Sequence, residues 1–275
     1  MSPSHERNDR YRVPKDAAAG RFRGRPGPPR GQPDKDGADW IWGWHTVTAA
    51  LANPLRAAPK RLLATDDRAQ ELTKRFGDLT ALAVMETAAI AALLPNGAIH
   101  QGLALKAIPP EPLDLDELAQ PAQGLLVMLD QLTDPQNVGA IFRSAAAFGA
   151  HGMILQDRHA PALSGALAKA AAGAIDALPH ARVVNLSRAL EQLADLGWRA
   201  VGLDGAAPEA LESVLDERPT VLVLGSEGEG LRRLVSEHCD ALGRIPMPGG
   251  FESLNVSTAA AIALYEASRP RRPPA

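Results

Sequence analysis

Three separated segments of the chain carry polar side chains that could bind a substrate. The first reads LTDPQNVGAIFR and places Asn137 six residues before Arg143, less than two helical turns. A guanidinium suits a phosphate or a ribose, and a carboxamide can both donate and accept hydrogen bonds. The two side chains could therefore flank one pocket, although Asp134 or Asn137 could equally cap a helix and a lone helical arginine is often a surface charge.

The second segment is a glycine-rich turn, LGSEGEGL, at residues 224–231. Its glycines at 225, 228 and 230 do not fit the pattern G-x-G-x-x-G, and no Gly-Lys-Ser/Thr follows them. NAD and ATP are therefore not expected as ligands. Glu227 could fix the loop by accepting backbone N–H bonds, or it could orient Arg143 through a charge-assisted pair.

The third segment follows a loop rich in proline and glycine, at residues 245–251, and opens the last predicted helix. Ser253, Asn255 and Ser257 stand at the start of this helix, where a serine or the asparagine could be an ordinary N-cap. Small polar groups at a helix start can also bind a polar ligand. Taken alone, this segment fits either interpretation.

Alternating strand and helix patterns place these three segments in a fold. Strands are predicted at 124–130, 152–155, 182–184, 199–203, 221–224 and 242–245, and helices at 136–148, 163–172, 187–196 and 254–268. Strands separated by helices of this length predict a parallel sheet covered on both faces. The polar segments then lie at strand ends, where the loops of such sheets usually hold ligands.

A smaller α/β unit is predicted before this sheet. Its helices are expected at 44–52, 67–76 and 86–94, and its strands at 61–64, 81–84 and 102–107. Trp40, Trp42 and Trp44 are expected to pack in its core, with base stacking as the alternative. His45 and His100 are expected to be satisfied structural histidines.

Four regions follow from these patterns: a tail at 1–38, the small unit at 39–108, a proline-rich linker at 109–123, and the larger domain at 124–270. The tail has nine basic and five acidic side chains and almost no apolar ones, so we expect it to be disordered. It would serve either as a solubilising leader or as an arm that tethers RNA.

Composition and charge narrow the class of protein further. No run of about 18 apolar residues occurs, which favours a soluble, cytoplasmic protein. Cys239 is the only cysteine and no zinc-type spacing is found, so no metal is expected. The formal net charge is −3, so any affinity for nucleic acid must come from local basic patches.

In combination, the three motifs resemble those of the SpoU-type members of the SPOUT superfamily of RNA ribose 2′-O-methyltransferases. The motifs are DPQNVGAIFRSA at 134–145, LGSEGEGL at 224–231 and IPMPGGFESLNVSTAAAIALYE at 245–266, in the family's order. The region 42–107, with Gly43 and His100-Gln101-Gly102, resembles the small substrate-binding domain of this family. Within it, the chain is most similar to bacterial enzymes that methylate a guanosine ribose in large-subunit (23S) ribosomal RNA.

The resemblance implies a fold and a cofactor. The fold would be α/β, with a C-terminal parallel-sheet SPOUT domain that contains a deep trefoil knot, preceded by a small α/β substrate-binding domain. The methyl donor would be S-adenosylmethionine, lined by Gly225, Ile245 and Leu254 largely through backbone atoms. The first 38 residues and the individual loop at 248–252 depart from the family's pattern, which leaves the fine substrate contacts open.

The resemblance also implies a catalytic side, completed across a homodimer, made of Asn137, Arg143, Glu227, Ser253 and Asn255. In the family's proposal the arginine, here Arg143, accepts the proton of the ribose hydroxyl. Because a guanidinium normally stays charged, positioning the phosphate and stabilising a developing alkoxide is the physically easier role.

Three alternatives stay open at this point. The substrate could be transfer RNA, although a preceding domain at 40–108 favours ribosomal RNA. The chain could also be an RNA-binding module without activity, or a structural protein of the ribosome that needs no methyl donor.

Overall fold

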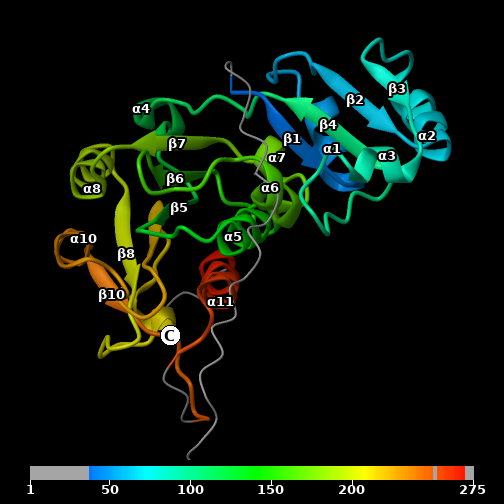
Figure 1. Ribbon diagram of the computed structural model, residues 1–275. Helices are drawn as coiled ribbons and strands as arrows, with labels where there is room; N and C mark the ends of the chain where they lie inside the picture. The colour runs from blue at the N-terminus through cyan, green and yellow to red at the C-terminus, as the bar shows by residue number, and fades with distance from the viewer. Residues whose placement is uncertain (1–36, 250–252, 270–275) are drawn as a thin grey trace, which may run out of the picture. The chain divides into compact units, whose positions relative to one another are not determined.

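This computed structural model describes residues 37–249 and 253–269. These residues form two β-sheets, each flanked by helices (Figure 1). The predicted tail at 1–38 lies almost entirely outside these residues, and so do three residues of the loop before the last helix. Residues from 37 onward fall within one compact unit. No described helix has both the length and the apolar character needed to cross a membrane.

The first sheet has four strands in the order β1-β4-β2-β3, and β4 runs antiparallel to both of its neighbours. Its strands are β1 (Asp39–Trp42), β2 (Arg61–Ala64), β3 (Leu82–Val84) and β4 (Leu103–Ala107), and its helices are α1 (Trp44–Ala52), α2 (Asp66–Phe76) and α3 (Thr87–Ala91). The predicted helices and strands are confirmed, with ends shifted by a few residues. The sequence analysis did not predict β1, although its aromatic and β-branched residues favour a strand.

Side chains alternate between the two faces of this sheet. Leu62 and Leu105 belong to the large core shared with the second sheet, whereas Leu63 and Ala104 pack with Trp42 and α3. This alternation follows the two-residue period of a strand. Trp42 is 5% exposed, so the prediction that it packs in the core is confirmed.

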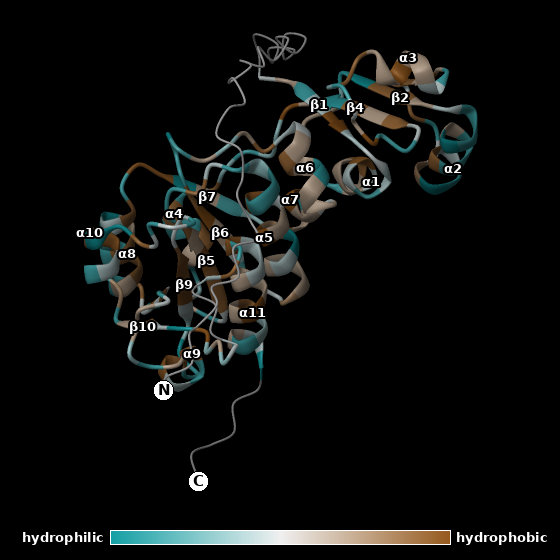
Figure 2. Cartoon of the chain, turned by 60° about the horizontal axis from the view of Figure 1, so that its bottom comes forward, coloured by the Kyte–Doolittle hydropathy of each residue, from teal (hydrophilic) through white to brown (hydrophobic). Residues whose placement is uncertain are grey.

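The second sheet has six parallel strands, which confirms the predicted parallel sheet, and their order is β10-β8-β9-β5-β6-β7. The strands are β5 (Leu125–Leu129), β6 (Gly152–Gln156), β7 (His180–Val183), β8 (Arg199–Leu203), β9 (Thr220–Leu224) and β10 (Ala241–Gly243). Every residue of β5, β6 and β9 is buried, because helices cover both faces of a parallel sheet. The strongly hydrophobic colours in Figure 2 accordingly fall on these central strands.

Helices divide between the two faces of the second sheet. One core contains α5 (Pro135–Ala147), α6 (Gly165–Ala171), α7 (Ala174–Ala177), α9 (Leu211–Val214) and α11 (Val256–Ser268). The other contains α4 (Leu115–Ala119), α8 (Leu186–Asp195) and α10 (Arg233–Glu237). The sequence analysis missed α4, α7, α9 and α10, all of which have five residues or fewer.

The segment predicted as a linker, 109–123, is packed against the second sheet. It contains α4, whose Leu115 and Leu118 are buried, and Leu113 forms a parallel bridge with Ala181 of β7. The prolines disfavour regular structure in this segment, but burial of the leucines stabilises its packed conformation, because burying one apolar side chain contributes about 1.5–3 kcal/mol. The four domain boundaries stay a prediction.

Close helix packing brings α5 and α6 together. A Cβ atom at Gly139 would lie 2.5 Å from the carbonyl oxygen of Leu167 in α6, so this position requires glycine. Gly139 therefore permits the close packing of α5 on α6. The trefoil knot stays a prediction.

Candidate active site

Three of the predicted site residues form one hydrogen-bonded cluster. Glu227 Oε1 accepts hydrogen bonds from Asn137 Nδ2 at 3.2 Å and from Asn255 Nδ2 at 2.7 Å. Asn255 Nδ2 also donates to Asn137 Oδ1 at 3.0 Å, and the backbone N–H of Val256 donates to Glu227 at 3.2 Å. All three motifs therefore meet in this Asn137–Glu227–Asn255 cluster.

Asn137 is available for this cluster because another residue caps its helix. The carboxylate of Asp134 accepts hydrogen bonds from the backbone N–H groups of Gln136 and Asn137, both at 3.2 Å, and Pro135 occupies the first turn. Of the two capping residues that the sequence allowed, Asp134 is the one found. The Asn137 carboxamide is left to point toward the loop after β9.

Asn255 is the N-cap of α11, one of the roles that the sequence allowed, and it also takes part in the cluster. Its Oδ1 caps α11 by accepting bonds from the backbone N–H groups of Ser257, at 3.0 Å, and Thr258, at 3.3 Å. Its Nδ2 meanwhile donates to Glu227 and Asn137. The cap thus fixes the direction in which the carboxamide N–H groups point.

The glycines after β9 close a small loop that carries Glu227. Ser226 and Gly230 exchange two backbone hydrogen bonds of 3.1 Å, and Gly228 and Gly230 have φ values of 86° and 67°. A Cβ at Gly225 would lie 2.2 Å from the Gly230 carbonyl group. These conformations and this close contact favour glycine, so the geometry of the loop accounts for its three glycines.

A buried carboxylate that the sequence analysis missed anchors the end of this loop. Asp130, which is fully buried, accepts hydrogen bonds from the backbone N–H of Arg232 at 2.9 Å and from its Nε at 2.7 Å. An aspartate at the end of an apolar strand was the available signal, because a buried charge requires a partner. Asp130 and Arg232 together hold the Glu227 loop to the end of β5.

Arg143 and Ser253 lie outside the Asn137–Glu227–Asn255 cluster. Six helical residues rotate Arg143 roughly 120° away from Asn137 around α5. Arg143 is exposed, and no ion pair joins it to Glu227 within the described residues, so the predicted pairing is not found. Ser253 is also exposed, and its side chain makes no hydrogen bond to another described residue.

The predicted cofactor residues come from three positions near the same edge of the second sheet. Gly225 follows β9, Ile245 follows β10 and Leu254 precedes α11. Gly225 is buried, Ile245 is half-buried and Leu254 is 37% exposed. Their main-chain groups could form hydrogen bonds with an adenosyl group, and the partly exposed side chains of Ile245 and Leu254 could pack against it.

The two histidines near the first sheet differ in their surroundings. His100 is 7% exposed, and its Nδ1 accepts a hydrogen bond from Gly102 N–H at 3.2 Å. Burial, and then the charge of Lys169, lower the pKa of His100. The prediction of a structural histidine is therefore confirmed for His100. His45 is exposed and its ring has no hydrogen bond to another described residue, so the same prediction was wrong for His45.

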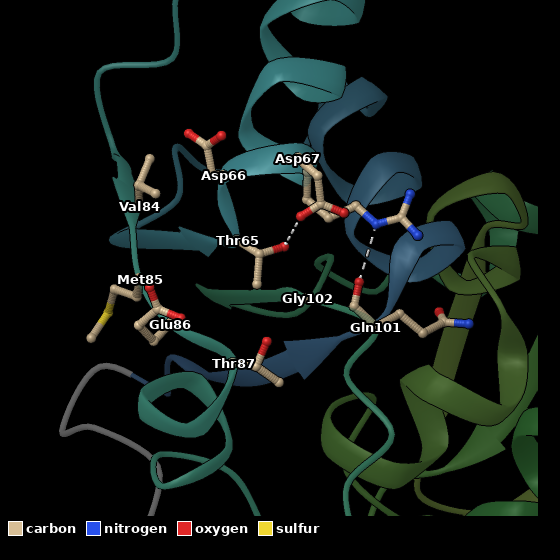
Figure 3. Close-up of a pocket in the computed structure, with 10 residues that line it drawn as sticks. Thr65, Asp66, Asp67, Val84, Met85, Glu86, Thr87, Gln101 and Gly102 are labelled. Atoms are coloured by element: carbon tan, nitrogen blue, oxygen red, sulfur yellow. Dashed lines mark hydrogen bonds between the residues drawn. The ribbon is translucent and has the colours of Figure 1, made fainter.

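A hollow of about 700 Å³ lies on the first sheet, where the parallel strands β2 and β3 end (Figure 3). Three carboxylates line it, those of Asp66, Asp67 and Glu86, against the single guanidinium of Arg68. Thr65 Oγ1 donates to Asp67 at 2.5 Å and is the main cause of a lowered Asp67 pKa. This negative charge makes the hollow a poor match for a nucleic-acid phosphate.

The chain is similar in sequence to one family of known proteins. Residues 124–265 match the model of the family described as SpoU rRNA Methylase family. An uncharacterized tRNA/rRNA methyltransferase of Mycolicibacterium smegmatis is 45% identical over 184 residues, which cover 65% of this chain and 59% of that protein. An uncharacterized tRNA/rRNA methyltransferase of Synechocystis is 38% identical over 260 residues, which cover 91% of this chain and 67% of that protein.

Among solved structures, the chain is similar to the SpoU methyltransferase AviRb from Streptomyces viridochromogenes in complex with the cofactor AdoMet. The TM-score is 0.71 and the identity 27%, covering 84% of this chain and 89% of that chain. The similarity therefore extends beyond the second sheet into the first. The chain spans less than two thirds of the length of the Mycolicibacterium smegmatis relative.

Proposed function

Because this chain belongs to the SpoU rRNA methylase family, we propose that it transfers a methyl group from S-adenosylmethionine to RNA. We propose further that the acceptor is the ribose 2′-hydroxyl of a guanosine in large-subunit (23S) ribosomal RNA, as the motif resemblance implies. The observation that carries the proposal is the Asn137–Glu227–Asn255 cluster, in which one residue from each motif meets.

S-adenosylmethionine would lie against Gly225, Ile245 and Leu254 and contact them largely through their backbone atoms. The cofactor supplies an electrophilic methyl group on a positively charged sulfur. The neighbouring residues would hold the adenosyl portion and exclude water from it. The AdoMet complex of AviRb supports S-adenosylmethionine as the cofactor.

A ribose hydroxyl is a weak nucleophile, so the protein must align it and assist the loss of its proton. Glu227 holds Asn137 and Asn255 in fixed directions, and their carboxamides would position the ribose. Arg143 would bind the adjacent phosphate and stabilise a developing alkoxide. A proton-accepting role fits less well, since a guanidinium normally stays charged.

Arg143 does not contact the cluster of its own chain, which supports completion of the site in a homodimer. In that arrangement, Arg143 and Ser253 would face the reacting groups across the subunit interface. Residues 39–108 would bind RNA beside the site, which favours ribosomal RNA over transfer RNA.

Calorimetry with S-adenosylmethionine and mapping of 2′-O-methylation in cells with and without the protein test this function. The expected results are cofactor binding and loss of one mark in 23S ribosomal RNA. Loss of a mark in transfer RNA alone would make transfer RNA the substrate. An absence of cofactor binding would instead indicate a noncatalytic RNA-binding module.

Glu227→Gln tests the cluster itself. The substitution keeps an acceptor oxygen but removes the charge that strengthens the hydrogen bonds, so we expect kcat to fall about tenfold or more. Glu229→Gln is the matched control, because Glu229 is an exposed carboxylate of the same loop without a side-chain partner among the described residues. Equal activity of the two variants would remove Glu227 from the proposed site.

A further inference from the structure

A groove of about 490 Å³ lies where α1 and the end of α2 meet α5 and α7. Its floor consists of small side chains, mostly alanines, and its polar members are His45, Thr48, Arg75 and Arg143. The Thr48 hydroxyl is already engaged, donating to the carbonyl oxygen of Trp44 at 2.8 Å. The groove therefore presents an apolar floor with two guanidinium groups and an exposed imidazole.

Close packing between α1 and the turn before α7 shapes this floor. A Cβ at Gly173, whose φ is 96°, would lie 2.8 Å from Ala49 Cβ and 3.0 Å from the His45 carbonyl oxygen. The buried pair of Arg56 and Asp176, with 2.7 Å between Nε and Oδ1, fixes the same two parts of the chain. The groove is thus held by packing and by an ion pair that does not itself line it.

The charge of the groove is positive and uncompensated. No carboxylate lines it, and within the described residues neither Arg75 nor Arg143 pairs with a carboxylate. Both side chains are exposed, and Arg75 stacks on the neighbouring Phe76 ring, 5.2 Å from its centroid. This local charge contrasts with the negative formal charge of the whole chain and with the carboxylate-rich hollow on the first sheet.

We propose that this groove binds single-stranded RNA next to the nucleotide that is methylated. A phosphodiester would lie between Arg75 and Arg143, and the face of a ribose or base would pack on the alanine floor. This inference rests on the proposed function, since Arg143 belongs to the first family motif. It assigns Arg75, from the helix that follows β2, to the substrate-binding surface of the same site.

The test is binding of fluorescein-labelled single-stranded RNA to the full chain, measured by anisotropy at several salt concentrations. Arg75→Gln should weaken binding severalfold and reduce the slope of log K against log salt by about 0.7, the value for one phosphate contact on a single strand. It should raise the KM for RNA, with kcat and S-adenosylmethionine affinity unchanged.

Lys74→Gln is the matched control, because Lys74 is an exposed cation in the same helical turn that does not line the groove. Equal RNA affinities and salt slopes for the two variants would overturn the proposal. A change in oligomeric mass for Arg75→Gln, without a change in RNA affinity, would also overturn it by assigning the groove to contacts between copies of this chain.

These experiments can refute RNA binding by the groove without refuting the proposed methyltransferase activity, and the reverse. If the wild-type chain neither binds S-adenosylmethionine nor methylates RNA, the proposed function fails, while an Arg75-specific loss of RNA binding would still support the groove. If methylation proceeds and Arg75→Gln matches Lys74→Gln in KM and in salt slope, only the groove is refuted.

Discussion

Asp176→Asn should destabilise the folded chain strongly. The Asp176 carboxylate, 3% exposed, accepts bonds from Arg56 Nε at 2.7 Å, Arg56 Nη2 at 3.2 Å and Asn53 Nδ2 at 3.1 Å. Arg56 is 4% exposed, and its Nη1 donates to the Ile108 carbonyl oxygen at 2.7 Å. The asparagine has nearly the same shape, but it leaves a buried guanidinium without a counter-charge.

Removing one partner of a buried ion pair costs about 3–5 kcal/mol. A change of 1 kcal/mol shifts Tm by about 2–4 °C for chains of roughly this size, so the variant should melt about 6–20 °C lower. The double variant with Arg56→Met and Asp176→Leu should recover most of this loss, because it removes both charges together with their desolvation cost. The double-mutant cycle would isolate the pairwise interaction.

Circular dichroism during urea and thermal unfolding measures these differences. Glu237→Gln is the control, since Glu237 pairs with Arg233 at 2.6 Å on the surface, where the side chains are 51% and 76% exposed. An exposed pair contributes about 0–1 kcal/mol, so this variant should unfold almost as the wild type does. If Asp176→Asn also stays within about 1 kcal/mol of wild type, the reasoning from burial is refuted.

Two further predictions concern the glycine loop and a buried histidine. Gly225→Ala places a Cβ 2.2 Å from the Gly230 carbonyl group, so the loop must move. Equilibrium dialysis should therefore show weaker binding of S-adenosylmethionine to this variant. An unchanged affinity would contradict the assignment of Gly225 to the cofactor site. His180 is 2% exposed, and burial, followed by the charge of Arg182, lowers its pKa from 6.5 to about 4. Between pH 6.5 and pH 4 the unfolded chain therefore binds more protons than the folded chain. The free energy of unfolding should be fully retained above pH 6.5 and should fall by roughly 3 kcal/mol as the pH drops toward 4. His180→Gln should flatten this dependence in urea titrations at pH 7, 5.5 and 4.5, and an equally steep loss in the variant would assign it to other groups.

Much of the second sheet could be predicted because its strands are short apolar runs separated by amphipathic helices. The short helices α4, α9 and α10 could not, since one turn of helix has no measurable period and its boundaries depend on tertiary contacts. The prolines around α4 also favoured a linker, whereas burial of Leu115 and Leu118 decided the structure.

Part of the site could likewise be predicted from the sequence motifs, whereas another part depends on tertiary contacts. The resemblance of the three motifs to those of a known family implied that Asn137, Glu227 and Asn255 belong to one site. The bond between Asp130 and Arg232 joins residues 102 positions apart, and no local pattern specifies it. The separation of Arg143 from the cluster follows from the rotation of α5 over six residues, which the prediction of one shared pocket did not take into account.

The cluster at Glu227 also has a consequence for folding. It joins residues 90 and 28 positions apart, and closing such long loops costs entropy before any contact forms. A partly folded chain in which α5 has formed but α11 has not docked would lack the cluster. Any activity that depends on the cluster would therefore require α11 to have docked.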